Sequence, residues 1–271
     1  EKARKEVKKI MPTVDVVIEV LDARLPRSST NPMIEKLRGD KPYLKVLTKS
    51  DLADPNVTEQ WLSYWREQRN TDALAITTQN TAVTMSITQR VLKMAPQRTL
   101  RTVPTSAMIL GIPNVGKSTL INTLVGRKVA NVGNEPAITK AQQKIRVTDD
   151  FVLIDTPGMT WPGSKDEMVN YRLAAGGAIR DTALEYDDVG IFAMDYLLQR
   201  YPHLVADYFK IKNLSDIAHE ALEQVAMRRG CKQGKRIDYM RAGEILVREM
   251  RAGKLGRISL EEPFVSYHQR G

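Results

Sequence analysis

Hydrophobic positions in the first 160 residues form short apolar runs, rich in branched aliphatic side chains, that alternate with segments of helical spacing. Short runs of this kind are typical of buried strands. They lie at residues 14–21, 43–47, 74–76, 107–110, 144–148 and 151–154. Strands that alternate with helices predict an α/β fold, with a mostly parallel sheet that is covered by helices on both faces.

The apolar runs stop at about residue 165, and only helical segments are predicted after it. In the first part, helices are predicted at residues 1–11, 31–37 and 86–94 and around Trp61 and Trp65, whose i,i+4 spacing favours a packed helix over a base-stacking surface. In the second part they are predicted at residues 166–178, 187–201, 215–228 and 242–251. We therefore expect two domains, an α/β domain at 1–165 and an all-α domain at 166–271.

The composition narrows the class of protein and its setting. The 271 residues carry a net charge of +9, which suits a polyanionic partner such as RNA but also occurs in proteins without one. A lone Cys231 and three scattered histidines argue against a disulfide or a structural zinc site. We find neither a signal peptide nor an 18-residue apolar run, so we expect a cytoplasmic protein with no membrane partner.

The segment GIPNVGKST at 111–119, called here the phosphate loop, matches the Gly-x4-Gly-Lys-Ser/Thr pattern between a predicted strand and a predicted helix. Gly111 and Gly116 allow the backbone to approach phosphate closely, so that amide groups of this loop point at it. Lys117 is expected to contact the β and γ phosphates, and Ser118 to bind Mg²⁺. The remaining loop residues expected to hold the nucleotide are Asn114, Val115 and Thr119.

Two further segments are predicted to complete the phosphate site. The strand 151–154 ends in Asp155 within FVLIDTPG, where a carboxylate can hold the Mg²⁺ shell. Gly158 of the same segment can donate a backbone N–H to the γ-phosphate. Thr139, between these motifs, is the candidate switch threonine for Mg²⁺, with a solvent-facing loop residue as the alternative. We expect Lys117, Thr139 and Gly158 to take part in catalysis.

The candidate base site lies upstream, at the end of the strand 43–47. Thr48, Lys49 and Asp51 fit the Asn/Thr-Lys-x-Asp pattern of guanine-binding proteins and are called here the base motif, residues 48–51. Asp51 can accept hydrogen bonds from guanine N1–H and the exocyclic amine, groups that adenine does not present in that pattern. Thr48 replaces the commoner asparagine, so guanine affinity is expected to be reduced. A second base loop follows at 76–80, with Thr77 and Thr78 as weaker candidates.

The order of these motifs is unusual, because the base motif precedes the phosphate loop. In ordinary GTPases it follows. The same site forms if the sheet is cut and rejoined, a connection that the Pro- and Arg-containing segment 95–106 would supply. The predicted fold is therefore a circularly permuted, Ras-like P-loop NTPase with an added all-α domain.

Together, the permuted order, GIPNVGKSTLIN, DTPG and the upstream VLDAR motif are similar to the YlqF-type family, ribosome biogenesis GTPase A. The resemblance extends over nearly the whole chain. It implies a GTPase that binds the immature large ribosomal subunit and its rRNA, acts late in assembly, and is slow until the subunit stimulates it. It also implies GTP or GDP with Mg²⁺ as ligands, and we expect a monomer.

Two details follow from the resemblance. Asn114 matches the asparagine that helps to hold K⁺ in potassium-stimulated GTPases; a loop residue that caps the following helix is the alternative. Met159 follows DTPG, and its apolar side chain cannot orient the attacking water. The family has a candidate histidine in a Pro-Gly-His-Met stretch upstream of the printed sequence, so we expect the printed chain to bind GTP normally but hydrolyse it poorly.

The candidate RNA-binding region is the basic segment 228–257, with ten Lys or Arg and three acids, a net charge of +7. Its single aromatic residue, Tyr239, favours structured rRNA over stacked single strands, although a solvated helix face has the same composition. Three other functions stay open at this point: a non-catalytic, nucleotide-dependent RNA-binding scaffold, an ATPase (because of Thr48), and a GTPase acting on tRNA or a membrane.

Overall fold

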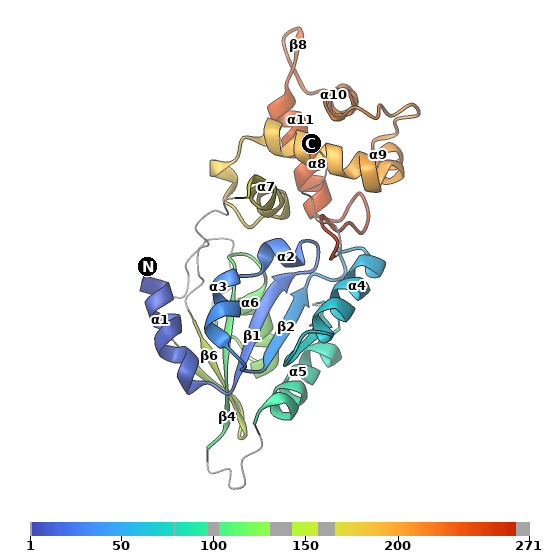
Figure 1. The fold of residues 1–271 in the computed structure, drawn as a ribbon. Helices are drawn as coiled ribbons and strands as arrows, with labels where there is room; N and C mark the ends of the chain where they lie inside the picture. The colour runs from blue at the N-terminus through green and yellow to red at the C-terminus, as the bar shows by residue number, and fades with distance from the viewer. Residues whose placement is uncertain (1, 78–79, 97–102, 131–142, 157–165, 264–271) are drawn as a thin grey trace. The chain divides into compact units, whose positions relative to one another are not determined.

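A computed structural model describes residues 2–77, 80–96, 103–130, 143–156 and 166–263, with side chains from residue 5 (Figure 1). These residues form two compact units. The first unit comprises residues 1–51, 55–162 and 261–271, and the second comprises residues 52–54 and 163–260. The domain boundary that we expect at residue 165 stays a prediction, since residues 157–165 lie outside the described residues.

The first unit is built on a six-stranded sheet in the order β3-β2-β1-β4-β6-β5. The strands are β1 (Val16–Asp22), β2 (Tyr43–Thr48), β3 (Thr71–Ala75), β4 (Thr105–Gly111), β5 (Gln143–Thr148) and β6 (Phe151–Asp155). All neighbouring strands run parallel except β5, which pairs antiparallel with β6. The mostly parallel α/β sheet predicted from the apolar runs is confirmed.

Strands β1 and β2 are buried along their entire length, as expected for central strands with helices on both sides. Figure 1 shows α1 and α3 in front of the sheet and α6 behind it. The helices of this unit are α1 (Lys2–Ile10), α2 (Pro26–Ser29), α3 (Pro32–Arg38), α4 (Pro55–Arg66), α5 (Thr81–Met94) and α6 (Lys117–Val125), with a 3-10 turn at Met11–Thr13.

Helix α1 lies on the sheet through its apolar face. Val7 and Ile10 belong to a buried cluster with Ile34 of α3 and with Val17 and Met108 of strands β1 and β4. Lys8 and Lys9 lie on the exposed face of the helix. The amphipathic helix expected from residues 1–11 is therefore a structural part of this unit, because burial of its apolar stripe stabilises it.

The tryptophan pair of α4 is part of the core. The Trp61 and Trp65 rings stack with centroids 4.9 Å apart, and both side chains are buried. Trp61 Nε1 donates to the Glu261 carbonyl oxygen at 3.1 Å, which joins α4 to the last segment of this unit. The packed-helix interpretation is confirmed for this pair.

The second unit is helical, with a two-stranded hairpin. It contains α7 (Glu167–Gly176), a 3-10 turn at Asp181–Ala183, α8 (Tyr186–Arg200), α9 (Pro202–Phe209), α10 (Ala218–Arg229), β7 (Lys232–Gln233), β8 (Arg236–Ile237) and α11 (Tyr239–Arg251). Helix α8 packs against α7, α9, α10 and α11. Within the described residues, no helix has the length and apolar character needed to cross a bilayer.

Helices α8 and α11 approach closely at two glycines. A Cβ on Gly243 would lie 1.9 Å from the Tyr186 carbonyl oxygen, and one on Gly190 would lie 2.5 Å from Gly243 Cα. No side chain fits between the backbones there. Glycine at both positions is what permits this contact.

Candidate nucleotide site

The phosphate loop follows β4 and ends at the first turn of α6. Asn114 and Gly116 adopt positive φ angles of 60° and 98°, so the chain turns sharply before Lys117 begins the helix. Alternation of right- and left-handed backbone directs successive N–H groups toward one point, where the positive end of the helix dipole adds to them. The loop therefore has the backbone shape of a phosphate-binding nest.

Gly111 packs tightly where β4 enters this loop. A Cβ there would lie 2.9 Å from both Val115 Cγ1 and the Val20 carbonyl oxygen. A glycine at this position brings the loop onto the end of β1. Val115 is buried beneath the loop, whereas Ser118 and Thr119 are placed on the first turn of α6, where Ser118 is partly exposed.

Lys117 and Asp155 come together from different elements. The Lys117 ammonium is hydrogen-bonded to Asp155 Oδ1 and also donates to the Thr156 carbonyl oxygen at 3.1 Å. Asp155 ends β6, which lies next to β4, and both side chains are buried, with Asp155 only 1% exposed. The two charged groups predicted from separate motifs therefore form one site at the carboxyl edge of the sheet.

The donor set at this edge fits a hydrated Mg²⁺ ion. Asp155 supplies a buried carboxylate, and Ser118 supplies a hydroxyl next to Lys117 on the first turn of α6. Carboxylate and hydroxyl oxygens are ligands that Mg²⁺ prefers, usually one or two from the protein with water and phosphate completing the shell. Thr139, the third predicted ligand, and Gly158 lie outside the described residues.

The base motif is held against the phosphate loop by its first two residues. Thr48 Oγ1 lies 2.5 Å from the Val115 carbonyl oxygen and 2.9 Å from that of Leu21. Lys49 Nζ donates to the Asn114 carbonyl oxygen at 2.9 Å. Residues 48–49 and 114–115, far apart along the chain, are thus in direct contact. The structure brings the base motif and the phosphate loop together as the sequence predicted.

The second base loop joins the same region. Ser50 donates through both its N–H, at 3.2 Å, and its hydroxyl, at 2.9 Å, to the Ile76 carbonyl oxygen. Thr77 follows Ile76 directly and is partly exposed, while Thr78 lies outside the described residues. Strands β2 and β3 are neighbours, so the loops that follow them meet at the same edge of the sheet.

Two charged residues near the base motif were not predicted as site residues. Asp22 is the last residue of β1, and its Oδ2 accepts hydrogen bonds from Lys49 Nζ at 2.9 Å and from Arg24 Nη2 at 2.7 Å. A usable signal was present, since an acid ends the apolar strand that precedes the base-motif strand. Parallel neighbours bring such strand ends together.

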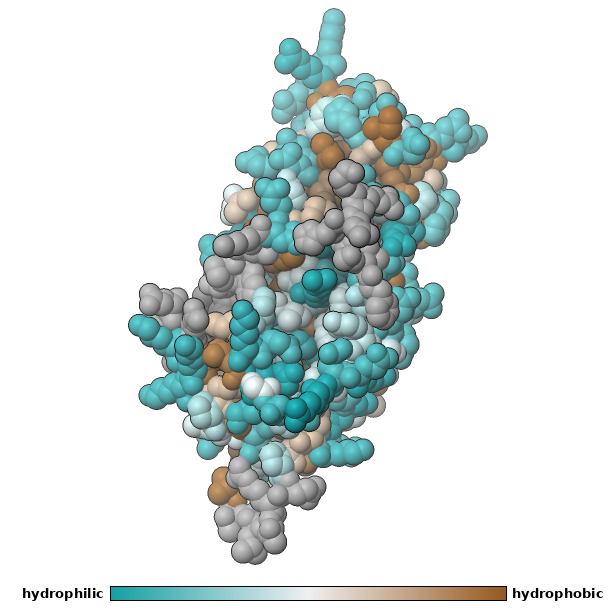
Figure 2. All heavy atoms as spheres, viewed as in Figure 1, coloured by the Kyte–Doolittle hydropathy of each residue, from teal (hydrophilic) through white to brown (hydrophobic). Residues whose placement is uncertain are grey.

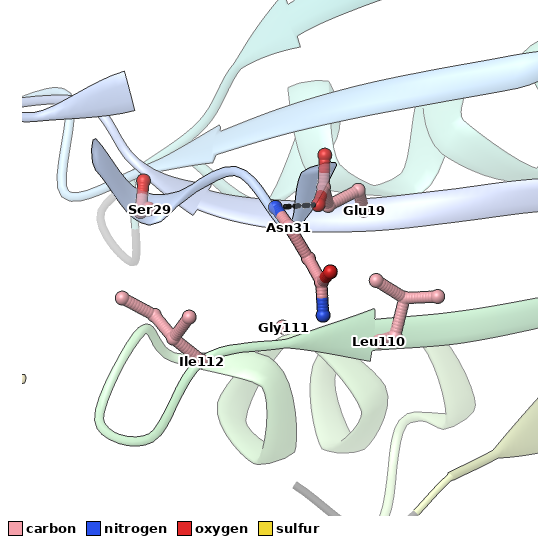
Figure 3. A pocket seen from close by; sticks show the side chains of 6 residues that line it. All are labelled: Glu19, Ser29, Asn31, Leu110, Gly111 and Ile112. Atoms are coloured by element: carbon pink, nitrogen blue, oxygen red, sulfur yellow. Dashed lines mark hydrogen bonds between the residues drawn. The ribbon is translucent and has the colours of Figure 1, made fainter. Parts of the chain in front are cut away.

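A small pocket beside the phosphate loop is lined by Glu19, Ser29, Asn31, Leu110, Gly111 and Ile112 (Figure 3). Asn31 N–H donates to Glu19 Oε1 at 2.7 Å, and the Asn31 side chain points toward β4. The other Glu19 oxygen accepts from Tyr43 Oη at 2.6 Å and Lys45 Nζ at 2.8 Å. Burial and the Glu19 charge raise the pKa of Tyr43 well above its usual value, so its hydroxyl stays a donor. This network holds Asn31 in place at the pocket.

Comparisons with known proteins agree with this geometry. Residues 106–227 match the family model described as "50S ribosome-binding GTPase". Ribosome biogenesis GTPase A of Priestia megaterium is 40% identical over 97% of this chain and 94% of its own length, and that of Bacillus cereus is 39% identical over 97% and 91%. The crystal structure of GNP-bound YlqF from T. maritima superposes with a TM-score of 0.67 at 25% identity, covering 98% of this chain and 100% of that one.

The fold and the phosphate site define a P-loop GTPase with a mostly parallel sheet and an additional helical part. The family within this class is shown by the relative that is 40% identical over nearly the full length of both chains. The chain belongs to the ribosome biogenesis GTPase A family.

Proposed function

We propose that this chain is a circularly permuted GTPase that binds the immature large ribosomal subunit through rRNA and acts late in its assembly. The observation that carries the proposal is the joining of the base motif to the phosphate loop, through Thr48 to Val115 and Lys49 to Asn114. A guanine-specific loop and a phosphate loop held together are what a GTP site requires.

The strand order supports the permuted arrangement. Strand β4, which carries the phosphate loop, lies between β1 and β6, and β2, which carries the base motif, lies on the far side of β1. Each of these parallel strands therefore delivers its motif to the same sheet edge, although the base motif comes first along the chain. The closing connection would be 95–106, of which 97–102 lie outside the described residues.

The chain's own groups account for nucleotide binding. Asp51 accepts from guanine, the phosphate-loop amides bind the phosphates, and Lys117 contacts the β and γ phosphates. Thr77 and Thr78 are the proposed contacts from the second base loop. Ser118, Asp155 and Thr139 would hold Mg²⁺, which neutralises charge that develops on the transferred phosphoryl group. For Lys117 to reach phosphate, its ammonium must exchange at least part of its bonding to Asp155.

Three catalytic assignments complete the proposal. Gly158 would donate its N–H to the γ-phosphate. Thr139 would be the switch threonine that moves toward Mg²⁺ and the γ-phosphate. Met159 cannot orient the attacking water, so another group must do so; the candidates are a K⁺ ion that Asn114 would help to hold and the histidine of the family's Pro-Gly-His-Met stretch. With the work divided in this way, hydrolysis by the chain alone is expected to be slow and the ribosomal subunit is expected to stimulate it.

The rRNA contact is proposed for the basic end of the helical unit. Six exposed basic residues follow one another through the end of α10, the hairpin and the start of α11: Arg228, Arg229, Lys232, Lys235, Arg236 and Arg241. Figure 2 shows hydrophilic side chains projecting at the end of this unit that carries β7 and β8. Among the described residues, none of the six forms an ion pair with a carboxylate. We name these six residues the hairpin cluster. The Arg229 guanidinium lies over the Tyr208 and Phe209 rings, but all six residues are exposed and can contact phosphates.

The other basic residues of this segment are engaged locally. Arg248 pairs with Glu244 at 2.8 Å, Arg251 with Asp181 at 2.8 Å, and Lys254 with Glu249 at 3.0 Å. The proposed RNA surface is therefore narrower than the whole basic segment 228–257. Assembly of a ribosomal subunit would place the protein in the cytoplasm, where we expect it to work as a monomer.

Two measurements on the same preparation test the proposal. Fluorescent GDP bound to the protein should be displaced by GTP and not by ATP, and Asp51→Asn should weaken that preference. Hydrolysis should then be measured with and without large ribosomal subunits, both for the printed chain and for the chain with the family's Pro-Gly-His-Met stretch added in front of it. Displacement by ATP would overturn the base site and leave an ATPase. Guanine-specific binding without subunit-stimulated turnover would instead leave an RNA-binding scaffold.

A further inference from the structure

Asp22 and Arg24 form a buried charged pair directly behind the base motif. Asp22 is 3% exposed and Arg24 is 5% exposed. Asp22 Oδ1 accepts from Arg24 N–H at 3.0 Å and from Arg24 Nε at 2.9 Å, while Oδ2 accepts from Arg24 Nη2 at 2.7 Å. The guanidinium is therefore bound in a two-pronged manner, the geometry that orients a carboxylate most firmly.

Asp22 Oδ2 also accepts from the base motif. It accepts from Lys49 Nζ at 2.9 Å, and the same ammonium donates to the Asn114 carbonyl oxygen at 2.9 Å. Lys49 also has a positive φ of 56°, which is costly for a residue with a side chain. Contacts that hold the ammonium in place help to maintain this backbone turn between Thr48 and Asp51.

Electrostatics tie Arg24 to the other end of the base motif. Burial would lower the pKa of Arg24, but Asp22 and, more weakly, Asp51 raise it above its usual value. Asp51, the residue assigned to guanine, therefore lies within electrostatic range of the Arg24 guanidinium. Arg24 is hydrogen-bonded to the carboxylate that holds Lys49, and the carboxylate that would bind the base attracts it more weakly.

We propose that Asp22 and Arg24 are positioning residues for guanine recognition: Asp22 clamps Lys49 between β1 and the phosphate loop, and Arg24 orients Asp22. The inference rests on the proposed GTP site, and assigns to it two residues that lie outside both the phosphate loop and the base motif. The clamp sets the direction of the short segment from Lys49 to Asp51. Discrimination at the exocyclic amine of guanine depends on that direction.

The test compares three diphosphates in competition with fluorescent GDP. IDP lacks the exocyclic amine of guanine, so the ratio of GDP to IDP affinity reports on the Asp51 contact, whereas ADP reports on base selection as a whole. A variant that merely unfolds part of the protein weakens GDP and IDP equally and leaves their ratio unchanged. A change in the ratio therefore separates positioning from general destabilisation.

Asp22→Asn keeps the shape of the side chain and removes its charge. We expect it to weaken GDP binding about tenfold, because a charge-assisted bond to Lys49 is removed, and to lower the GDP-to-IDP ratio. The double variant Asp22→Asn with Arg24→Gln removes both charges without leaving Arg24 buried and uncompensated, so it keeps the test open if the single variant is unstable. In a Lys49→Met background, Asp22→Asn should have little further effect, because Asp22 acts through Lys49.

Asp72→Asn is the matched control. Asp72 pairs with Arg90 at 2.6 Å in the same unit, near the opposite end of β3, and has no part in the site. Its replacement should leave the GDP-to-IDP ratio unchanged. An unaltered ratio in both Asp22 variants, with wild type still selecting GDP over ADP, would overturn the clamp alone. Failure of the wild type to select GDP over ADP would instead overturn the proposed guanine site.

Discussion

Thr48 occupies the position where asparagine is commoner in the base motif, and its hydroxyl lies between two carbonyl oxygens, those of Val115 and Leu21. One hydroxyl hydrogen is shared between them, and both acceptors belong to buried residues. The side chain thus joins β1, β2 and the loop. Its short length suits the tight contact, since Gly116 lies close to Thr48.

Replacing this hydroxyl should therefore loosen the phosphate loop from the base motif. We expect Thr48→Val to lower the free energy of unfolding by about 1 kcal/mol, the usual net contribution of an intramolecular hydrogen bond. GDP affinity should fall with it. Thr48→Ser keeps the hydroxyl and serves as the control. Urea unfolding and fluorescent GDP titration measure both quantities, and equal behaviour of the Val and Ser variants would show that the hydroxyl is dispensable.

Asp22 gives the site a defined pH dependence. Burial would raise its pKa, but Arg24 and Lys49, through charge and hydrogen bonds, outweigh this and hold the pKa far below its usual value. A depressed folded-state pKa stabilises the fold above the unfolded-state pKa, roughly pH 4, and this contribution is lost as pH falls toward the folded-state pKa. The difference in unfolding free energy between wild type and Asp22→Asn should be constant from pH 7 to about 5 and shrink below about pH 4. Urea titrations at each pH measure it; a difference that shrinks already near neutral pH would contradict the assignment.

Residue patterns predicted that several of the candidate site residues would lie together, because these groups sit at the ends of parallel strands. Asp155 and Thr48 directly end apolar runs, Lys117 follows one after a short loop, and parallel pairing brings those ends to one edge. Asp22 and Arg24 belong to the upstream VLDAR motif, and an acid at the end of an apolar strand was a usable signal for Asp22, but its bond from Lys49 could not be predicted because it depends on the register of β1 against β2. Spacing along the chain does not reveal a contact of that kind.

At the scale of elements, the strands were predicted best and the short pieces worst. The six apolar runs correspond to β1 to β6, with ends shifted by a few residues. Helix α2 was not predicted, and Glu261 holds it in place, because its carboxylate accepts from Ser28 N–H at 2.8 Å and Ser28 Oγ at 2.6 Å. A helix of four residues needs such distant support, so no local pattern predicts it.

Helix α9 and the hairpin were also missed, although both have local signals. Pro202 stands at the first position of α9, where its missing N–H costs nothing, and marks the start of a new helix after α8. Gly234, with a φ of 62°, lies in the turn between β7 and β8. Strands of two residues are too short for alternation to be detected.

The crossing of α8 and α11 yields a sharp prediction for the helical unit. In Gly243→Ala the new methyl would meet the Tyr186 backbone oxygen at 1.9 Å, so the helices must separate. We expect a decrease of roughly 1–3 kcal/mol in unfolding free energy, in the range of overpacked cores. Gly230→Asn is the control, because Gly230 caps α10 at a φ of 66° with no atom near its Cβ position, and asparagine tolerates that backbone. Calorimetry that finds both variants equally stable would mean that the close approach is relaxed in solution.

At the scale of the whole molecule, each unit takes residues from more than one stretch of the chain. The helical unit includes residues 52–54, where Ile258 N–H donates to the Leu52 carbonyl at 2.9 Å and Arg257 Nε to that of Ala53 at 2.8 Å. The first unit includes Glu261, which accepts hydrogen bonds from Ser28 and Trp61. Cutting the chain at a single point between the two units therefore removes residues from both of them.

A fragment that ends at residue 165 should accordingly be less stable than the same unit in the full chain. It would leave the Ser28 N–H and the Trp61 Nε1–H, both in buried residues, without their Glu261 acceptors. We expect a lower midpoint of unfolding in urea, followed by Trp fluorescence, and weaker GDP binding. Glu261→Ala in the full chain removes only the carboxylate and should reproduce part of the effect. A fragment as stable as the full chain would show that these bonds contribute little.

Charge distribution decides how the molecule would meet rRNA, and salt dependence can locate the binding surface. If the hairpin cluster binds phosphates, neutralising Lys235 and Arg236 should weaken binding to large ribosomal subunits and lower the slope of log affinity against log salt by roughly one for each phosphate that is no longer bound. Arg248→Gln with Lys254→Gln is the matched control: it removes the same total charge from the same unit, but these side chains are already paired with Glu244, Asp181 and Glu249.

Sedimentation with ribosomal subunits over a series of KCl concentrations measures both slopes. GDP affinity is the control: it should be unchanged in both variants, which would show that the nucleotide site is intact. A net-charge effect would lower the two slopes equally, because long-range attraction depends on total charge. Direct phosphate binding would lower only the slope of the hairpin variant, since each bound phosphate releases its own counterions. Equal slopes would therefore reject the hairpin cluster as the rRNA-binding surface even if both variants bind more weakly.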